Sequence, residues 1–153
     1  MGKVEASIDV NVPVSTAYNQ WTQFEEFPQF MEGVKQVRQL DDRTLEWTAN
    51  IAGSEETWRA EIDQQEPDQR IAWHSIEGAR NAGAVDFHRL DDNTTRIMLM
   101  MEFEPEGAVK QVGDALGFPE RRVRGDLQRF KDFIESRGGE SGAWRGRIEQ
   151  TKV

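Results

Sequence analysis

Hydrophobic and polar residues alternate strictly at the start of the chain. From Lys3 to Val12 every second residue is apolar, which is typical of a strand that buries one face and exposes the other. Six later segments have a similar character, and short polar turns separate them. These predicted strands span residues 34–40, 44–51, 54–64, 70–76, 83–90 and 95–103. Because consecutive strands joined by short turns pair antiparallel, the pattern predicts a curved, seven-stranded antiparallel sheet.

Helical spacing replaces the alternation in two places. After Pro13, apolar residues at positions 14, 17, 18, 21 and 24 form one stripe, and Pro28 disfavours its continuation, so two short helices are expected. Near the C-terminus there are two further stripes, separated by Gly117-Phe118-Pro119. The first consists of Val109, Val112 and Leu116, and the second of Val123, Leu127, Phe130 and Ile134. The pattern predicts a long C-terminal helix, kinked or broken at residues 117–119, that ends near Gly138-Gly139.

This order of elements predicts an α+β fold of the helix-grip type, in which the long helix covers the concave face of the sheet. We expect a single domain over residues 1–139 and a tail over 140–153, with Trp144 as its one large apolar anchor. One helix does not fill the concave volume of such a sheet. The sequence therefore predicts a cavity between the sheet and the helix.

Composition narrows the classes of function. The 153 residues include 28 acidic and 19 basic side chains and have a net charge of −9, which disfavours nucleic-acid binding. The absence of cysteine excludes disulfides, thiolate metal sites and cysteine nucleophiles. The longest apolar run, residues 97–101, is far shorter than the ~20 residues of a membrane-spanning helix, and the start does not resemble a signal peptide. We expect a cytoplasmic protein without a cofactor or metal ion.

The charges are unevenly distributed. Residues 1–106 carry a net charge of −12, whereas residues 107–153 carry +3. The basic residues cluster on the predicted C-terminal helix at Arg121, Arg122, Arg124, Arg129 and Lys131. They form either a solvated helix face or a patch that meets an anionic membrane or an acidic partner.

Tryptophans are the main candidates for ligand contact. Trp47, Trp58 and Trp73 fall in successive strands at inward positions, where they form either ordinary core or the wall of a pocket. Ser75 shares their face and Asn81 lies in the next turn, so each can bond a ligand carbonyl or the local backbone. The predicted cavity lining is Trp47, Trp58, Trp73, Ser75, Phe87, Leu99, Met101, Phe103, Leu116 and Phe118.

Catalytic chemistry has little support in the sequence. Alternation places His74 and His88 on the outer face of the sheet, and no nucleophile elbow or convincing Ser-His-Asp arrangement is present. Glu32 and Arg80, in predicted loops, can reach a cavity mouth but form no recognisable pair. Met98 and Met100 also face outward, where they offer an apolar patch for a homodimer. No catalytic residue is predicted.

Several longer phrases resemble a known family. They are Phe27-Pro28-Gln29-Phe30-Met31-Glu32-Gly33-Val34, Arg70-Ile71-Ala72-Trp73-His74-Ser75, Gly83-Ala84-Val85-Asp86-Phe87, Arg124-Gly125-Asp126-Leu127-Gln128-Arg129-Phe130-Lys131 and Gly142-Ala143-Trp144-Arg145-Gly146. With the element order, they resemble bacterial START-like helix-grip (SRPBCC) proteins, and most closely the polyketide cyclase/dehydrase and coenzyme Q-binding subgroup. This resemblance covers nearly the whole chain and implies a cavity for a hydrophobic ligand.

Two functions follow as expectations. The first is a binding or carrier protein for a hydrophobic small molecule, such as a lipid, a polyprenyl quinone or a polyketide-like compound. The alternative is an aromatase/cyclase or dehydratase that acts on a polyketide-like substrate, which needs an acid or base aimed into the cavity. The residue types favour binding over catalysis.

Overall fold

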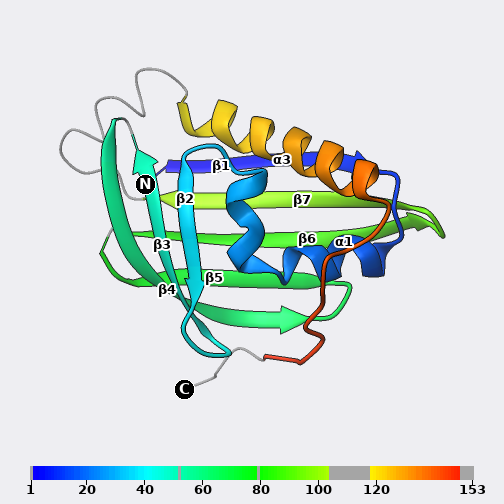
Figure 1. Cartoon of the computed structure of the whole chain (residues 1–153), viewed down its shortest axis with the longest axis horizontal. Coiled ribbons are helices and arrows are strands. Elements are labelled where there is room, and N and C mark those ends of the chain that lie inside the picture. Colours follow the sequence, from blue (N-terminus) through cyan, green and yellow to red (C-terminus); the bar gives the residue numbers. More distant parts are fainter. Residues whose placement is uncertain (1, 52, 79, 104–117, 149–153) are drawn as a thin grey trace.

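The computed structural model describes residues 2–51, 53–78, 80–103 and 118–148, and shows one strongly curled antiparallel sheet with helices on its concave side (Figure 1). The strands are β1 (Gly2–Val10), β2 (Val34–Gln39), β3 (Thr44–Ile51), β4 (Ser54–Glu66), β5 (Arg70–Glu77), β6 (Asn81–Asp91) and β7 (Thr94–Phe103). Their order is β1-β7-β6-β5-β4-β3-β2. Six strands thus form a meander, and β1 pairs with the last of them. The predicted α+β helix-grip architecture is confirmed.

Alternation sets which side of each strand is buried. In β1, Val4 and Val10 are buried, whereas Lys3, Glu5 and Asp9 on the opposite side are exposed. Because successive side chains of a strand point to opposite faces, this pattern buries the concave face and leaves the convex face to solvent. The sequence predicts both faces correctly for this strand.

Several strand ends differ from the prediction. β1 ends at Val10, two residues before the predicted end at Val12, and β5 and β7 are each one residue longer than predicted. β4 continues two residues further, to Glu66, past a register shift between Ile62 and Gln64. β6 begins at Asn81, two residues before the predicted start, so Gly83 lies inside the strand.

Two short helices follow β1, as predicted. α1 (Val14–Trp21) begins directly after Pro13, and the 3-10 helix η1 (Phe24–Gln29) contains Pro28. Both lie on the concave side of the sheet (Figure 1). Ala17, Tyr18 and Trp21 from α1 are buried in the core.

The long helix α3 (Phe118–Arg137) runs along β1 on the concave side (Figure 1). Pro119 lies in its first turn, where the lack of an amide hydrogen costs no helical bond. The helix ends before Gly138, whose φ of 80° is the left-handed conformation that glycine adopts readily. The expected helical face at Val109, Val112 and Leu116 lies outside the described residues, so the predicted kink or break has no test. None of the described helices combines the length and hydrophobicity that crossing a bilayer requires.

The tail after α3 packs along α1. The backbone amide of Ser141 donates to Gln20 Oε1 (2.8 Å), and that of Trp144 donates to Thr22 Oγ1 (3.0 Å). Ile148 then forms an isolated antiparallel bridge with Gln65 of β4. Trp144 is half-buried against the core, in agreement with its predicted role as an apolar anchor.

Candidate functional site

The concave face of the sheet has two ends that differ in how completely helices cover them. We call the end beneath α1 the sealed end, defined by Val10, Tyr18, Trp21, Phe87 and Ile97. Tyr18, Val10 and Ile97 have no exposed surface, and Trp21 and Phe87 have almost none. This end is ordinary protein core.

Edge-to-face aromatic contacts organise the sealed end. The Phe87 ring lies 5.4 Å from that of Tyr18 and 6.3 Å from that of Trp21. Trp21 in turn contacts Phe130 of α3 at 4.7 Å. Because such arrangements match the positive edge of one ring to the negative face of another, they stabilise one fixed packing. Phe87 and Leu99, both predicted to line a cavity, are buried here.

The other end of the concave face, the open end, consists of Trp47, Trp58, Trp73, Ser75 and Met101. Trp58, Ser75 and Met101 point inward by alternation but remain partly exposed. Trp47 and Trp73 each keep 7% of their surface accessible. Five of the predicted lining residues therefore lie together where the helices leave the sheet incompletely covered.

Trp47 and Trp58 form a stacked pair at this end. They are direct partners across β3 and β4, and their rings are nearly parallel (6°) with centroids 5.9 Å apart. Trp47 also contacts Phe27 of η1 at 5.6 Å, which fixes one side of the pair. Trp58 is the partly exposed member. The pair presents a flat aromatic surface at the open end.

Gly83 makes room for a second flat surface. Trp73, Gly83 and Met101 are neighbours across β5, β6 and β7. A Cβ atom on Gly83 would lie 2.5 Å from the Trp73 ring and 2.8 Å from Met101 Sδ. The indole therefore lies over the glycine, beside the thioether of Met101. A glycine inside a strand is typical of such a close approach.

Polar groups at the open end differ in whether they are already bonded. Ser75 Oγ accepts a hydrogen bond from the backbone amide of Asn81 (3.0 Å), which is the local role considered for it. In contrast, the buried Nε1–H of Trp47 has no acceptor among the described residues. Trp21 at the sealed end has a similarly unpartnered Nε1–H. A buried donor without an acceptor costs about 1–3 kcal/mol.

Tyr18 is a buried ionisable group at the sealed end. Burial raises the pKa of its hydroxyl from 10.0 to about 12, whereas the Gln65 side chain and the Arg145 charge act to lower it. The Arg145 guanidinium lies 5.6 Å from the centre of the Tyr18 ring. At neutral pH the hydroxyl is therefore protonated.

Three basic side chains of α3 donate hydrogen bonds to backbone carbonyls elsewhere in the molecule. Arg122 Nη1 donates to the Glu32 carbonyl (2.8 Å), and Arg129 Nε donates to the Phe30 carbonyl (3.0 Å). Lys131 Nζ donates to the Asp9 carbonyl at 3.0 Å. These bonds tie α3 to the loop after η1 and to β1, so the interpretation as a simple solvated face is wrong for these three side chains. Contact with an anionic membrane stays a prediction.

The partly buried carboxylate of Asp126 adds to the bonds between α3 and the loop after η1. Asp126 Oδ1 accepts from the Glu32 amide (3.1 Å) and also pairs with Arg129. Burial raises the pKa of Asp126, against the opposing effect of the Arg129 hydrogen bond. Glu32, which the sequence placed near a cavity mouth, lies 3.3 Å from Arg129. The loop and the helix are thus held together by paired charges.

Three predicted lining residues have no described side chain. Leu116 lies outside the described residues altogether, while Phe103 and Phe118 lie in β7 and α3 but their side chains are not described. Their place in a ligand site stays a prediction.

Comparison with solved structures agrees with the helix-grip architecture. The Zhui aromatase/cyclase from Streptomyces sp. R1128 superposes with a TM-score of 0.78 at 18% identity, over 94% of this chain and 99% of that one. A START superfamily protein from Mycobacterium smegmatis gives 0.74 at 14% identity, over 88% and 97%. At these identities the likeness concerns the fold alone.

Sequence comparison reaches the family. An uncharacterized 17.2 kDa protein from Streptomyces lincolnensis is 54% identical over 149 residues, which cover 97% of this chain and 99% of that protein. The family described as "Polyketide cyclase / dehydrase and lipid transport" matches residues 10–132. The predicted resemblance to polyketide cyclase/dehydrase proteins is confirmed, and the fold agrees with that of a START superfamily protein, whereas the coenzyme Q-binding subgroup stays a prediction. The chain belongs to the polyketide cyclase/dehydrase and lipid transport family.

Proposed function

We propose that the protein binds a hydrophobic small molecule that carries a carbonyl acceptor, and that it does so at the open end of the concave face. The observation that carries this proposal is the unpartnered Nε1–H of Trp47 beside the partly exposed ring of Trp58. Flat indole rings suit an apolar, planar ligand, and the sulfur of Met101 adapts to its shape. A carbonyl oxygen on the ligand supplies the missing acceptor once the neighbouring side chains move apart, because the nitrogen itself is buried.

Polyprenyl quinones combine these properties. Their ring is flat and carries carbonyl oxygens, and their isoprenoid chain is apolar. The family description names lipid transport, which supports a carrier role for such a ligand. A carrier needs binding and release but no acid or base.

A pair of conservative substitutions tests the proposal. Trp47→Phe removes the N–H but keeps an aromatic ring, and Trp21→Phe does the same at the sealed end. With decylubiquinone as the probe, we expect Trp47→Phe to weaken binding about fivefold to tenfold, which corresponds to one hydrogen bond. Trp21→Phe is the matched control and should bind like the wild type. The measurement is quenching of tryptophan fluorescence, normalised for each variant.

Two results contradict this proposal. One is the absence of saturable quinone binding by the wild type in detergent below the critical micelle concentration. The other is an equal loss of affinity in the two variants, which indicates a general change in packing. A hydrocarbon of similar size without carbonyl groups should bind to the wild type more weakly than the quinone does. It should bind to Trp47→Phe with the same affinity as to the wild type.

The family description also names polyketide cyclases, which supports a second proposal, that the same face directs the cyclisation of a poly-β-ketone. Proton transfer in that reaction needs a positioned acid or base. Tyr18 is an interior candidate, but its pKa of about 12 keeps it protonated at neutral pH, so its role is limited to donating a hydrogen bond. Incubation with a poly-β-ketone thioester analogue, followed by product analysis, tests this function. A product distribution identical to that of the spontaneous reaction contradicts it.

A further inference from the structure

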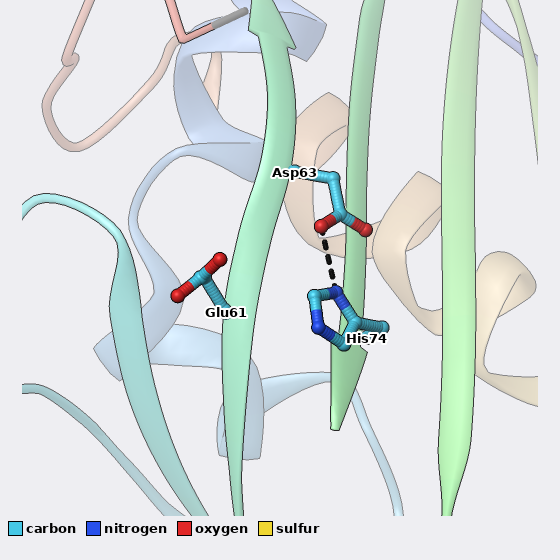
Figure 2. A group of neighbouring side chains, drawn as sticks. All are labelled: Glu61, Asp63 and His74. Atoms are coloured by element: carbon cyan, nitrogen blue, oxygen red, sulfur yellow. Dashed lines mark ion pairs between the residues drawn. The ribbon is translucent and has the colours of Figure 1, made fainter. Parts of the chain in front are cut away.

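Three metal-ligating side chains gather on the convex face of the sheet, opposite the ligand face. They are Glu61 and Asp63 of β4 and His74 of β5 (Figure 2). One ligand atom from each lies within 4.8 Å of the other two. His74 and Asp63 point toward each other, with 2.6 Å between Nδ1 and Oδ1. The chain has only one other histidine, His88.

Strand pairing places these three side chains on one face. Glu61 lies directly opposite His74 in the β4–β5 ladder, and Ile62 lies opposite Trp73. Because alternate residues of a strand share a face, Asp63 lies on the same side as Glu61 and diagonally across from His74. The register shifts between Ile62 and Gln64, so a β-bulge at Asp63 bends the strand beside this cluster.

Burial and charge suit a bound cation. The side chains of His74 and Asp63 are 42% and 27% exposed, so solvent ions reach them while the paired strands hold their backbones. The Arg43 guanidinium donates to the backbone carbonyl of Ile62 (3.4 Å). The two carboxylates of the cluster carry two negative charges, which equal in magnitude the charge of one divalent ion.

We propose that Glu61, Asp63 and His74 bind a divalent transition-metal ion of the Zn²⁺ class. Carboxylate oxygens alone suit Mg²⁺ or Ca²⁺, whereas an imidazole nitrogen beside them favours a borderline ion such as Zn²⁺. Zinc lies about 2.0–2.2 Å from such ligands. Rotation of the three side chains from their present spacing is sufficient, and water takes the fourth position. The ion then cross-links β4 and β5, in contrast to the expectation of a protein without a metal ion.

Calorimetric titration of ZnCl₂ into the untagged full chain at pH 7.5 tests this site. We expect one ion per chain. His74→Ala should lower the affinity at least tenfold, because even second-shell changes cost about 10–100-fold at metal sites. His88→Ala is the matched control, since His88 is the other histidine and is exposed on the same face. It should bind Zn²⁺ like the wild type.

Two conservative variants and a spectrum make the test independent of folding. Glu61→Gln and Asp63→Asn keep size and shape, and each should weaken binding while the circular dichroism spectrum in EDTA stays unchanged. In long-range ¹H–¹⁵N spectra of the imidazoles, Zn²⁺ should shift the ring nitrogens of His74 and leave those of His88 in place. Absence of binding at millimolar Zn²⁺, or binding that survives all three substitutions, overturns the proposal. Because the site lies across the sheet from the open end, quinone binding should be unaffected by either result.

Discussion

The sealed and open ends of the concave face are built from similar residues but differ in what those residues do. Both ends present tryptophan, and both contain a buried indole N–H without a described acceptor. At the sealed end, rings from α1, η1 and α3 meet edge to face and leave almost no exposed surface. At the open end, Trp58 and Met101 have one side uncovered. Aromatic content alone therefore does not distinguish core from candidate binding surface.

The two ends differ in which helices and strands contact their tryptophan rings. Trp21 has ring neighbours in η1, in Phe30 directly after η1, in α3 and in the sheet. The stacked Trp47 and Trp58 have described ring neighbours only in each other and in Phe27. A side chain surrounded on all sides contributes its full burial energy to folding. One that is covered on a single side keeps part of its surface for a ligand.

The largest expected effect is the loss of stability on truncation at the sealed end. Trp21→Ala removes a fully enclosed ring and leaves a cavity lined by Phe27, Phe30 and Phe130. We expect the free energy of unfolding to fall by about 3–5 kcal/mol. Urea unfolding followed by circular dichroism measures this change. A loss below about 1 kcal/mol would contradict the assignment of this end as core.

The second-largest effect on stability is expected at high pH, where the buried Tyr18 ionises. The pKa of Tyr18 rises from 10.0 to about 12 on folding, so the folded state holds the proton more tightly than the unfolded state. The associated stability is complete below pH 10 and is lost as the pH rises toward 12, by about 2–3 kcal/mol. The difference in the free energy of unfolding between the wild type and Tyr18→Phe should change with pH over this interval only.

Tyr18 is also the single tyrosine of the chain, which provides a direct control. Absorbance at 295 nm should report its ionisation near pH 12 in the folded protein and near pH 10 in urea. A folded-state midpoint near 10 would show that the hydroxyl is hydrated and that the sealed end admits water.

A smaller loss of stability is expected from a substitution at Gly83, which lies between Trp73 and Met101 of the open end. Gly83→Ala places a methyl group against the Trp73 ring and the Met101 sulfur, so at least one of them must move. We expect a loss of about 1–3 kcal/mol, as for other overpacked sites. Thermal unfolding measures the loss, and Gly83→Ala combined with Met101→Ala should recover part of it if the thioether is the group that yields.

Truncation at the open end should have the smallest effect on stability. Trp58→Ala removes a ring that is already partly exposed, and we expect a loss of about 1 kcal/mol, well below that of Trp21→Ala. The same substitution should abolish most quinone binding, because it removes one of the two stacked rings. If Trp58→Ala destabilises the protein as much as Trp21→Ala, the open end is core and the proposed ligand face is wrong.

Much of the fold follows from alternation and turn residues. The inward positions of Trp47, Trp58 and Trp73 and the outward position of His74 depend only on counting along regular strands, and all are confirmed. The start of α1 directly after Pro13 and the glycine after α3 reflect local backbone preferences, which are visible in the sequence. These features need no knowledge of distant residues.

Other features depend on partners that counting does not reveal. Alternation places Glu61, Asp63 and His74 on the outer face, but it does not reveal which residues pair across β4 and β5, nor the bulge at Asp63 beside His74. The reason for a glycine at position 83 is visible only when Trp73 is known to lie over it. Similarly, Arg122 and Arg129 look like surface charges until the carbonyls of Glu32 and Phe30 are placed beside them.

The tail that follows α3 has a consequence for how the protein folds as it is synthesised. Asn19 of α1 bonds to Glu140 and Arg145, which lie 121 and 126 positions later in the chain. β1 likewise pairs with β7, the last strand to be made. β1 and α1 therefore cannot form these contacts until β7 and the tail have been synthesised, and contacts between residues so far apart in the chain slow folding. Until those later segments have been synthesised, the apolar face of β1 and α1 lacks its native partners.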